Sequence, residues 1–357
     1  TPLIAAQGIA ILLEAGVPPG VVQLLPGQGE TVGAQLTGDD RVRGVMFTGS
    51  TEVATLLQRN IASRLDAQGR PIPLIAETGG MNAMIVDSSA LTEQVVIDVL
   101  ASAFDSAGQR CSALRVLCLQ DEIADHTLKM LRGAMAECRM GNPGRLTTDI
   151  GPVIDSEAKV NIERHIQTMR SKGRPVFQAV RENSEDAREW QSGTFVTPTL
   201  IELDDFAELQ KEVFGPVLHV VRYNRNQLPE LIEQINASGY GLTLGVHTRI
   251  DETIAQVTGS AHVGNLYVNR NMVGAVVGVQ PFGGEGLSGT GPKAGGPLYL
   301  YRLLANRPES ALAVTLARQD AEYPVDSQLK AALTQPLNAL REWAANRPEL
   351  QALCTQY

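Results

Sequence analysis

The sequence predicts an α/β fold with a partial doubly wound parallel sheet, a second α/β region and a helical tail. Two observations lead to this prediction. Short apolar runs bounded by Gly and Pro alternate with amphipathic, Ala- and Leu-rich segments along most of the 357 residues, which is typical of parallel sheets with crossover helices. The apolar runs are continuous, as expected for strands covered on both faces. With 43% hydrophobic and 19% charged residues, the chain can bury a sizeable core.

The first 79 residues alternate between helix and strand signals. Val53, Leu57, Ile61 and Leu65 recur every four residues, so they share one face of a helix. Gly16 and the Pro18–Gly20 turn interrupt the pattern between elements. The predicted helices span 3–15, 31–36 and 52–65, and the predicted strands span 21–25, 42–47 and 73–76.

Residues 80–304 are predicted to form a second α/β domain. Residues 173–192 are polar and read as a surface excursion, and the Gly- and Pro-rich residues 278–297 read as loop. A charged helical tail is expected over 305–357. The predicted strands are 83–86, 114–119, 199–203, 217–222, 244–248 and 265–268, and the predicted helices are 92–104, 123–138 and 156–172.

Composition argues against several functional classes. A net charge of −9 and 4% aromatic residues do not suit a nucleic-acid surface, which needs clustered cations and stacking rings. No apolar run approaches the roughly 20 residues of a membrane span. The four cysteines form no C-x-x-C pair, which favours a reducing compartment, the cytoplasm. The five histidines show no ligand spacing, so no metal is expected. A start at Thr1 without Met suggests an internal fragment.

Cys111 is the candidate nucleophile. It lies in Ser106-Ala107-Gly108-Gln109-Arg110-Cys111-Ser112-Ala113, a loop of small residues whose adjacent Arg110 is expected to lower the pKa of the thiol. Local context alone leaves open a second interpretation, a small buried core residue. Cys118 lies within an apolar strand and is interpreted as core.

Two further positions carry candidate chemistry. Glu77 ends an apolar strand, where a half-buried carboxylate could serve as a base; a capping or solvated acid is the alternative. Thr48-Gly49-Ser50 joins a strand to a helix, so the free N–H groups there suit an anion, although plain capping by Ser50 explains the same pattern. Gly284-x-Gly286-x-x-Gly289 matches a dinucleotide fingerprint but lacks the strand before it and the helix after it.

Together these segments resemble the aldehyde dehydrogenase superfamily over residues 1 to about 304. The resemblance is carried, in order, by five motifs: Phe47–Ser50, Glu77–Gly80, Gly108–Cys111, Glu212–Pro216, and Pro281–Gly284 followed by Ser288-Gly289. It implies that residues 1–79 are the C-terminal part of an NAD-binding domain and that 80–304 form the catalytic domain.

The resemblance also implies a mechanism. Cys111 would add to the aldehyde to give a thiohemiacetal, a thioester would follow, and Glu77 would activate the water that hydrolyses it. Cofactor contacts are implied for Thr48, Gly49, Ser50, Thr78, Gly79, Glu212 and Phe214.

Within the superfamily, Gln109–Ala113 and Ser288–Pro297 resemble the glutamate semialdehyde (pyrroline-5-carboxylate) dehydrogenase branch. That branch implies that the substrate carboxylate is held by Ser112 and an anchor loop, with N–H groups nesting the anion. Phe282, Gly295 and Gly296 are the remaining implied substrate contacts.

The stretch 76–87 and the tail 307–326 resemble the fused bacterial enzymes of proline catabolism. This implies an upstream proline dehydrogenase with FAD, homo-oligomerisation, and a parent protein that can sit at the inner membrane. The oxyanion-stabilising Asn of the family and the residues that read the adenine ribose would lie upstream of Thr1, so the isolated chain is expected to be inactive or poorly folded. The branch favours NAD over NADP.

Other functions stay open at this point. The chain could come from a monofunctional enzyme of the same branch or from another aldehyde dehydrogenase, such as one for succinate semialdehyde. A cofactor-binding structural protein without catalysis would not need both Glu77 and Cys111. An acyl-transfer enzyme would need a His paired with the Cys, and none lies in a suggestive context.

Overall fold

The computed structural model describes residues 2–66, 69–179, 193–276 and 278–304, with Asn338 and Glu342. Residues 1–303 form one compact unit and 304–357 a second. The helical tail predicted over 305–357 lies outside the described residues except for Asn338 and Glu342, both of which are helical.

The N-terminal part holds a small parallel sheet of two strands, β1 (Val45–Thr48) and β2 (Leu74–Glu77). Helix α3 (Thr51–Ala62) packs on it through the buried Ala54 and Ile61. The strands run in register, so that Thr48 lies opposite Glu77. The register therefore brings the candidate anion turn and the candidate base together at the carboxyl ends of these two strands. The other helices here are α1 (Pro2–Glu14), the π-helix η1 (Gly29–Gly33) and α2 (Ala34–Gly38).

The predicted strand at 21–25 is wrong. Its residues form a turn followed by irregular chain, with Val21 69% and Leu25 57% exposed. A strand needs a neighbour for its backbone N–H and C=O groups, and no described strand lies beside this segment. The predicted strand at 42–47 begins later, at Val45.

The larger sheet has seven strands in the order β10-β9-β3-β4-β7-β6-β5. All neighbours are parallel except the edge strand β5, which pairs antiparallel with β6. Its central strands are fully buried, which accounts for their continuous apolar sequences. The strands are β3 (Ala83–Val86), β4 (Val116–Gln120), β5 (Val176–Gln178), β6 (Thr199–Leu203), β7 (Val217–Tyr223), β9 (Thr243–His247) and β10 (Asn265–Val268).

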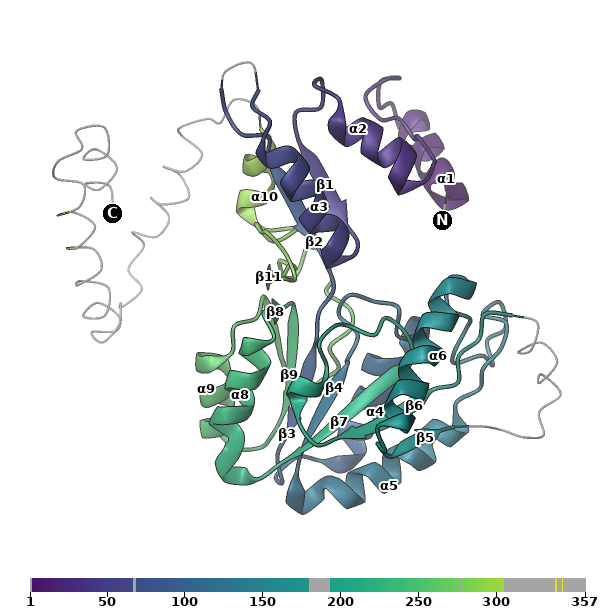
Figure 1. Ribbon diagram of the computed structural model, residues 1–357, viewed down its shortest axis with the longest axis vertical. Helices are drawn as coiled ribbons and strands as arrows, with labels where there is room; N and C mark the ends of the chain where they lie inside the picture. Colours follow the sequence, from purple (N-terminus) through teal and green to yellow (C-terminus); the bar gives the residue numbers. More distant parts are fainter. Residues whose placement is uncertain are drawn as a thin grey trace. The chain divides into compact units, whose positions relative to one another are not determined.

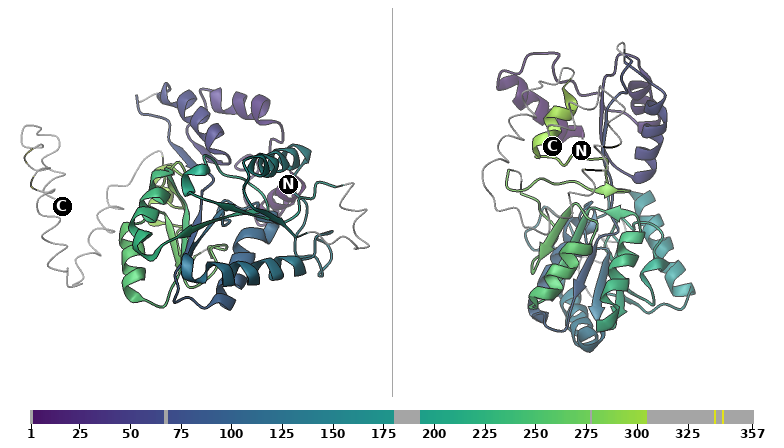
Figure 2. Two further views of the ribbon diagram at one scale, coloured as in Figure 1. Left: turned by 60° about the horizontal axis from the view of Figure 1, so that its bottom comes forward. Right: turned by 90° about the vertical axis from the view of Figure 1, so that its left-hand side faces the viewer.

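Helices cover both faces of this sheet (Figures 1 and 2). The chain moves from β3 to β4 in one direction and from β7 to β9 and β10 in the other, so right-handed crossovers place their helices on opposite faces. Helices α4 and α5 lie on one face, and α8 and α9 lie on the other. The helices are α4 (Thr92–Phe104), α5 (Asp121–Glu137), α6 (Ser156–Ser171), α8 (Leu228–Ala237), α9 (Asp251–Ser260) and α10 (Pro297–Leu303).

Several elements of the second region were not predicted, including helix α10. Strand β5 lies within the supposed surface excursion, helices α8 and α9 were not assigned, and the supposed loop 278–297 contains the short strand β11 (Glu285–Gly286). Strand β11 pairs with β8 (Tyr240–Gly241), over 40 residues earlier in the chain. Two-residue strands leave no periodicity to detect, because only the tertiary partner defines them.

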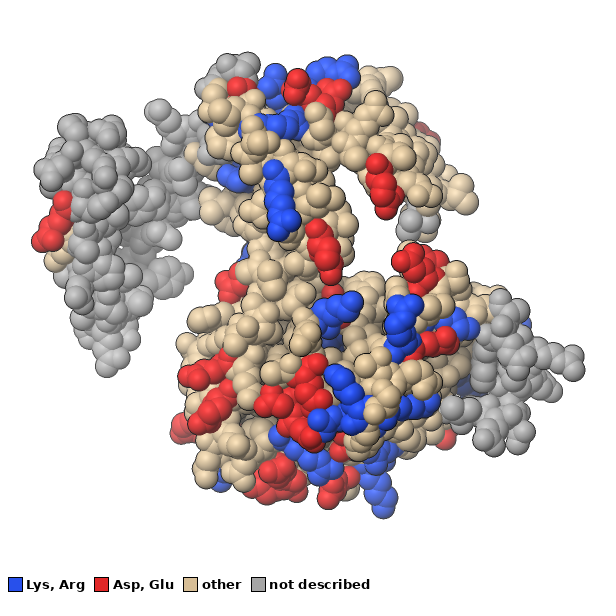
Figure 3. Space-filling view, in the orientation of Figure 1, with Lys and Arg blue, Asp and Glu red and all other residues tan. Residues whose placement is uncertain are grey.

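Charged side chains are mixed on the surface. On the face drawn in Figure 3, Lys and Arg are interspersed with Asp and Glu. Among the described residues, no helix combines the length and apolar character that crossing a membrane demands.

Candidate active site

Glu77 lies where the two sheets meet, at the end of β2. Its Oε2 accepts a hydrogen bond from the backbone N–H of Gly284 at 3.0 Å, while its buried Oε1 has no hydrogen-bond partner among the described residues. Burial raises the pKa of this carboxyl above its ordinary value, and the Gly284 N–H and Lys293 oppose the shift. Glu77 is therefore a half-buried carboxylate, and one of its oxygens accepts no hydrogen bond from the described residues.

The Gly-rich segment after Pro281 wraps around Glu77. Gly289 bridges to Glu77 by backbone pairing, and the Thr78 hydroxyl donates to the Leu287 carbonyl at 2.6 Å. A Cβ added to Gly283 or Gly289 would lie 3.0 Å from a Glu77 oxygen, closer than a side chain tolerates without movement. Gly283 and Gly289 therefore leave space for the Glu77 carboxylate, and Gly289 is the last glycine of the fingerprint-like pattern.

Cys111 follows a strained turn. Ser106, Ala107 and Gly108 all have φ between 54° and 66°, and left-handed conformations of this kind cost non-Gly residues about 1–2 kcal/mol each. Gly108 has to be glycine because a Cβ would overlap the carbonyl of Gly215. The segment that follows Glu77 reaches this turn, since the Asn82 side chain donates to the carbonyl of Cys111 at 2.6 Å.

The expectation that Arg110 lowers the pKa of Cys111 is wrong. Arg110 Nε donates to the Ser106 hydroxyl at 3.1 Å in an exposed position. The pKa of Cys111 is instead raised, first by burial and then by the charge of Glu212, with a smaller contribution from Glu77. Backbone N–H groups of Ser112 and Cys111 oppose the shift.

Glu212 lies beside both Cys111 and the turn after β2. It accepts hydrogen bonds from Arg115 Nε (3.1 Å) and from an Arg115 terminal nitrogen (2.9 Å), and the Gly80 N–H donates to it. Arg115 is 2% exposed, so the pair is withdrawn from water. Gly79 has to be glycine here, since a Cβ would overlap the Glu212 carboxylate.

Arg115 holds several segments together. Its guanidinium also donates to the carbonyls of Gly108 at 2.6 Å and Arg110 at 3.0 Å, and it lies 5.1 Å from the ring centre of Phe214. Phe214 itself is 45% exposed. An exposed ring beside a carboxylate is a surface that suits a flat heterocycle carrying a sugar.

The turn Thr48–Ser50 caps helix α3, which is the alternative interpretation of its sequence pattern. Ser50 is the N-cap of α3, and its hydroxyl accepts from the Val53 N–H at 3.2 Å. The Gly49 N–H donates to the Glu77 carbonyl at 3.1 Å. Thr48, Gly49 and Ser50 are exposed, so the start of this 12-residue helix is open to a ligand.

The predicted anchor loop folds back on itself. Phe282 and Ala294 exchange backbone hydrogen bonds of 2.9 and 2.8 Å, and Gly295 adopts φ +75°. The Gly296 N–H already donates to the Lys293 carbonyl at 3.1 Å, so an anion would have to compete for it. Ser112 is buried next to Cys111.

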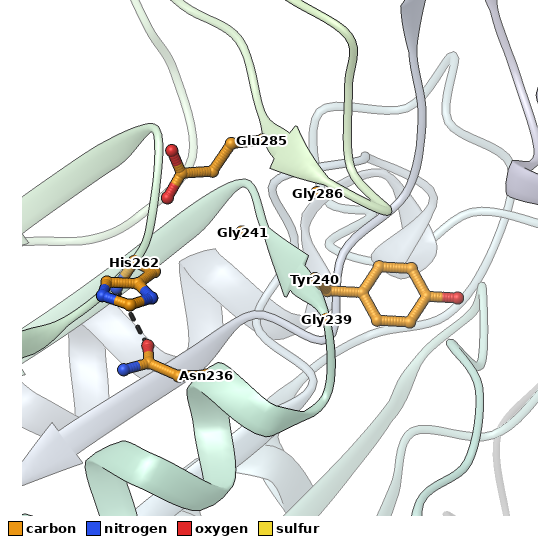
Figure 4. A pocket seen from close by; sticks show the side chains of 7 residues that line it. All are labelled: Asn236, Gly239, Tyr240, Gly241, His262, Glu285 and Gly286. Carbon is orange, nitrogen blue, oxygen red and sulfur yellow. Dashed lines mark hydrogen bonds between the residues drawn. The ribbon is translucent and has the colours of Figure 1, made fainter. Parts of the chain in front are cut away.

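A pocket of about 430 Å³ lies behind the β8–β11 pair (Figure 4). His262 and Glu285 face it, whereas the Tyr240 side chain points to the opposite side of the strand. Burial raises the pKa of Tyr240, the Thr51 side chain opposes this shift, and the charge of Glu212 adds to it. Its ring therefore belongs to the region of Ser50 and Glu212. Among the described residues, no cluster of His, Cys, Asp or Glu could hold a metal ion.

The aldehyde dehydrogenase family model matches residues 1–305. The chain belongs to this family. The bifunctional protein PutA of Escherichia coli K12 is 98% identical over the whole chain, which covers 27% of that protein. A crystal structure of bifunctional proline utilization A superposes with a TM-score of 0.79 at 51% identity, over 85% of this chain and 30% of that one. A structure of a 1-pyrroline-5-carboxylate dehydrogenase from Thermus with bound NAD superposes with a TM-score of 0.76 at 36% identity. The match covers 84% of this chain and 57% of that one. The chain thus spans about a quarter of its E. coli relative.

Sequence reasoning missed three residues around this aldehyde dehydrogenase site: Asn82, Arg115 and Lys293. All three act mainly on backbone carbonyls, and a side chain that bonds to backbone leaves no motif of partners in the sequence. A buried Arg inside the apolar run that follows Cys111 was the available signal, since Arg is almost never fully buried without a partner.

Replacing Arg115 should destabilise the fold strongly. Arg115→Met would leave Glu212 buried without its counter-charge, which costs roughly 3–5 kcal/mol. The free energy of unfolding would be measured by urea denaturation of a full-length chimera, the E. coli relative in which this chain replaces the matching segment. Arg222→Met is the control: Arg222 is 38% exposed where it pairs with Asp125 and Glu202, so it should cost under about 1 kcal/mol. Equal losses of unfolding free energy in the two variants would contradict this prediction.

Proposed function

We propose that this chain supplies the nucleophile, the base and part of the cofactor site of an NAD-dependent dehydrogenase that oxidises glutamate semialdehyde to glutamate, as one half of a bifunctional enzyme of proline catabolism. One observation carries the proposal: Glu77 ends β2 and Cys111 lies before β4, yet the segment that follows Glu77 reaches the Cys111 loop, where Asn82 donates to the carbonyl of Cys111 at 2.6 Å. The motifs of the family therefore meet in one site.

The residues present fit a nicotinamide dinucleotide. The open start of α3 at Ser50 suits a pyrophosphate, Glu212 can accept from ribose hydroxyls, and Phe214 offers an exposed ring. Gly79 lies against the Glu212 carboxylate, and Thr78 precedes it in the chain. When bound, the cofactor would accept the hydride and the protein would provide the geometry. The bound NAD of the Thermus relative supports this choice.

The chemistry assigned to this chain has two stages. The Cys111 sulfur adds to the aldehyde carbon, and oxidation of that adduct leaves a thioester on Cys111. Glu77 then takes a proton from water, whose oxygen attacks the thioester carbon and releases the acid and the Cys111 thiol. Glu77 is the better base of the two nearby carboxylates, because it forms no ion pair among the described residues, whereas Glu212 is bound to Arg115.

The substrate carboxylate is assigned to Ser112 and the loop containing Gly295 and Gly296, with Phe282 packing beside the substrate chain. In the part of the chain that the structure describes, the Gly295 N–H donates to no other backbone group. PutA and the 1-pyrroline-5-carboxylate dehydrogenase relatives support this substrate class. The proline dehydrogenase with its FAD, and assembly into a homo-oligomer, belong to the proposed whole enzyme.

Initial rates of NADH formation by the full-length chimera test the substrate. Glutamate semialdehyde should be preferred over pentanal, which lacks the charged end, because a hydrogen bond to a charged group contributes about 1.5–3 kcal/mol. This predicts a kcat/KM at least about 10-fold higher for each hydrogen bond that pentanal cannot make. A preference for succinate semialdehyde would instead assign the chain to another branch of the family.

A further inference from the structure

Asn82 is a buried polar residue for which the proposed mechanism has no role. It lies just before β3 and is 2% exposed. Its side-chain NH2 donates to the carbonyl of Cys111 at 2.6 Å and to that of Ala113 at 2.9 Å. Its side-chain oxygen accepts from the backbone N–H of Thr243 at 3.2 Å. Two acceptors on one side and a donor on the other fix the orientation of the carboxamide.

The loop after the nucleophile is therefore held by its carbonyls. Asn82 binds the carbonyls of Cys111 and Ala113, and the Thr243 hydroxyl lies 3.5 Å from the carbonyl of Ser112 between them. Gly80 makes room for this arrangement, since a Cβ there would overlap the Asn82 side chain. Asn82 and Thr243 together thus bind the carbonyls of all three residues from 111 to 113.

The peptide unit between Cys111 and Ser112 links Asn82 to the sulfur. The C=O and N–H of one trans peptide point in opposite directions, so holding the Cys111 carbonyl turns the Ser112 N–H the other way. The Ser112 N–H lowers the pKa of the Cys111 thiol and so favours its thiolate form. A hydrogen bond to the carbonyl also polarises the peptide and makes its N–H a stronger donor.

We propose that Asn82 is a positioning residue for the nucleophile: by holding the Cys111 carbonyl, it aims the N–H of Ser112 at the sulfur and stabilises the thiolate. The proposal rests on the proposed role of Cys111. Burial and the charges of Glu212 and Glu77 oppose ionisation, and Arg115 and Tyr267 are the other titratable groups coupled to this sulfur. We call the arrangement of Asn82, the Cys111 carbonyl and the Ser112 N–H the relay. It offsets part of their effect on the pKa of Cys111 without introducing a charge.

The test is the pH dependence of Cys111 alkylation by iodoacetamide in the full-length chimera, with mass spectrometry to identify the modified cysteine. Asn82→Ala removes the relay and should raise the apparent pKa of the Cys111 thiol by about one unit. This shift is equivalent to the loss of one hydrogen bond to a charged group. The thiolate fraction at pH 8 would fall about 10-fold. The higher nucleophilicity of a more basic thiolate offsets part of this, leaving alkylation about 3-fold slower.

Asn269→Ala is the matched control. The Asn269 side chain also binds backbone in both directions, accepting from the Thr248 N–H at 3.0 Å and donating to the Thr248 carbonyl at 2.9 Å. Thr248 directly follows β9, whereas Thr243 begins it. The control should lose stability and keep the wild-type alkylation profile. A folded Asn82→Ala protein with an unshifted profile, or an equal shift in the control, would overturn the proposal.

If Asn82→Ala does not fold, hydrogen exchange tests whether the Ser112 N–H is bonded to the Cys111 sulfur, the contact on which the relay depends. In the unaltered chimera the Ser112 amide should be protected, and Cys111→Ala should remove that protection because the accepting sulfur is gone. Equal exchange in the two proteins would overturn the relay. Neither readout depends on turnover, so failure of the relay is separable from failure of the proposed function, which would show as activity retained in Cys111→Ala.

Discussion

Replacing Cys111 by alanine should abolish aldehyde oxidation by the full-length chimera. Without the sulfur no thiohemiacetal can form, and loss of a nucleophile typically lowers kcat by about 10⁴-fold or more. Initial rates of NADH formation with glutamate semialdehyde measure the effect. The thermal midpoint should change little, because Cys111 is only partly buried.

Cys118→Ala serves as the control for this experiment. Cys118 is fully buried in β4, and burial raises the pKa of its thiol to about 12, so it has neither access nor a thiolate at neutral pH. The variant should keep its kcat and lose some stability through the cavity left in the core. Activity that survived in Cys111→Ala and vanished in Cys118→Ala would reverse the assignment.

Glu77→Gln should slow turnover by about 10²–10⁴-fold, the usual contribution of a general base. The affected step is hydrolysis, so the first turnover should still form about one NADH per site before the reaction stalls. Rapid mixing would show this burst, and mass spectrometry would find the acyl group on Cys111. Loss of the burst together with turnover would place Glu77 in an earlier step.

Glu285→Gln provides the comparison for Glu77. Glu285 is an exposed carboxylate in the same Gly-rich segment but faces the pocket behind β8 and β11 (Figure 4). Its replacement should leave both the burst and kcat unchanged. A loss of turnover similar to that of Glu77→Gln would mean that the segment, and not the base, had been disturbed.

The pKa of Glu77 also predicts the acid side of the pH profile. Hydrolysis requires the carboxylate form, so the rate should fall as pH decreases through the folded-state pKa. Because burial raises that pKa, the fall should begin at a higher pH than for an exposed glutamate, and it should be absent from the residual activity of Glu77→Gln.

Much of the fold could be predicted from local sequence. The buried parallel strands β3, β4, β7 and β9 were recognised because continuous apolar runs reflect burial on both faces. Elements defined by a distant partner were missed or misassigned. The run 21–25 is apolar but has no strand beside it, and β11 exists only because it pairs with β8.

The site divides in the same way. Cys111 and Glu77 stand out because their reactive side chains occur next to Gly and small residues, whereas Glu212 was assigned only through the resemblance to the family. Their electrostatic environment was not predictable: Arg110, the neighbour in sequence, turns to Ser106, whereas Arg115 and Asn82 bind the loop. Coulomb interactions and hydrogen bonds depend on distance in space, which sequence separation does not specify.

Apolar periodicity and motif spacing are properties of the chain, so they were enough to predict the α/β class, the family and the candidate nucleophile and base. Folding in three dimensions sets Thr48 beside Glu77 through the register of β1 and β2, and it pairs Glu212 with Arg115. It also decided that the Cys111 thiol is shifted upward in pKa. Each of these depends on which surfaces are removed from water and which groups then meet, and that is settled only when the chain packs.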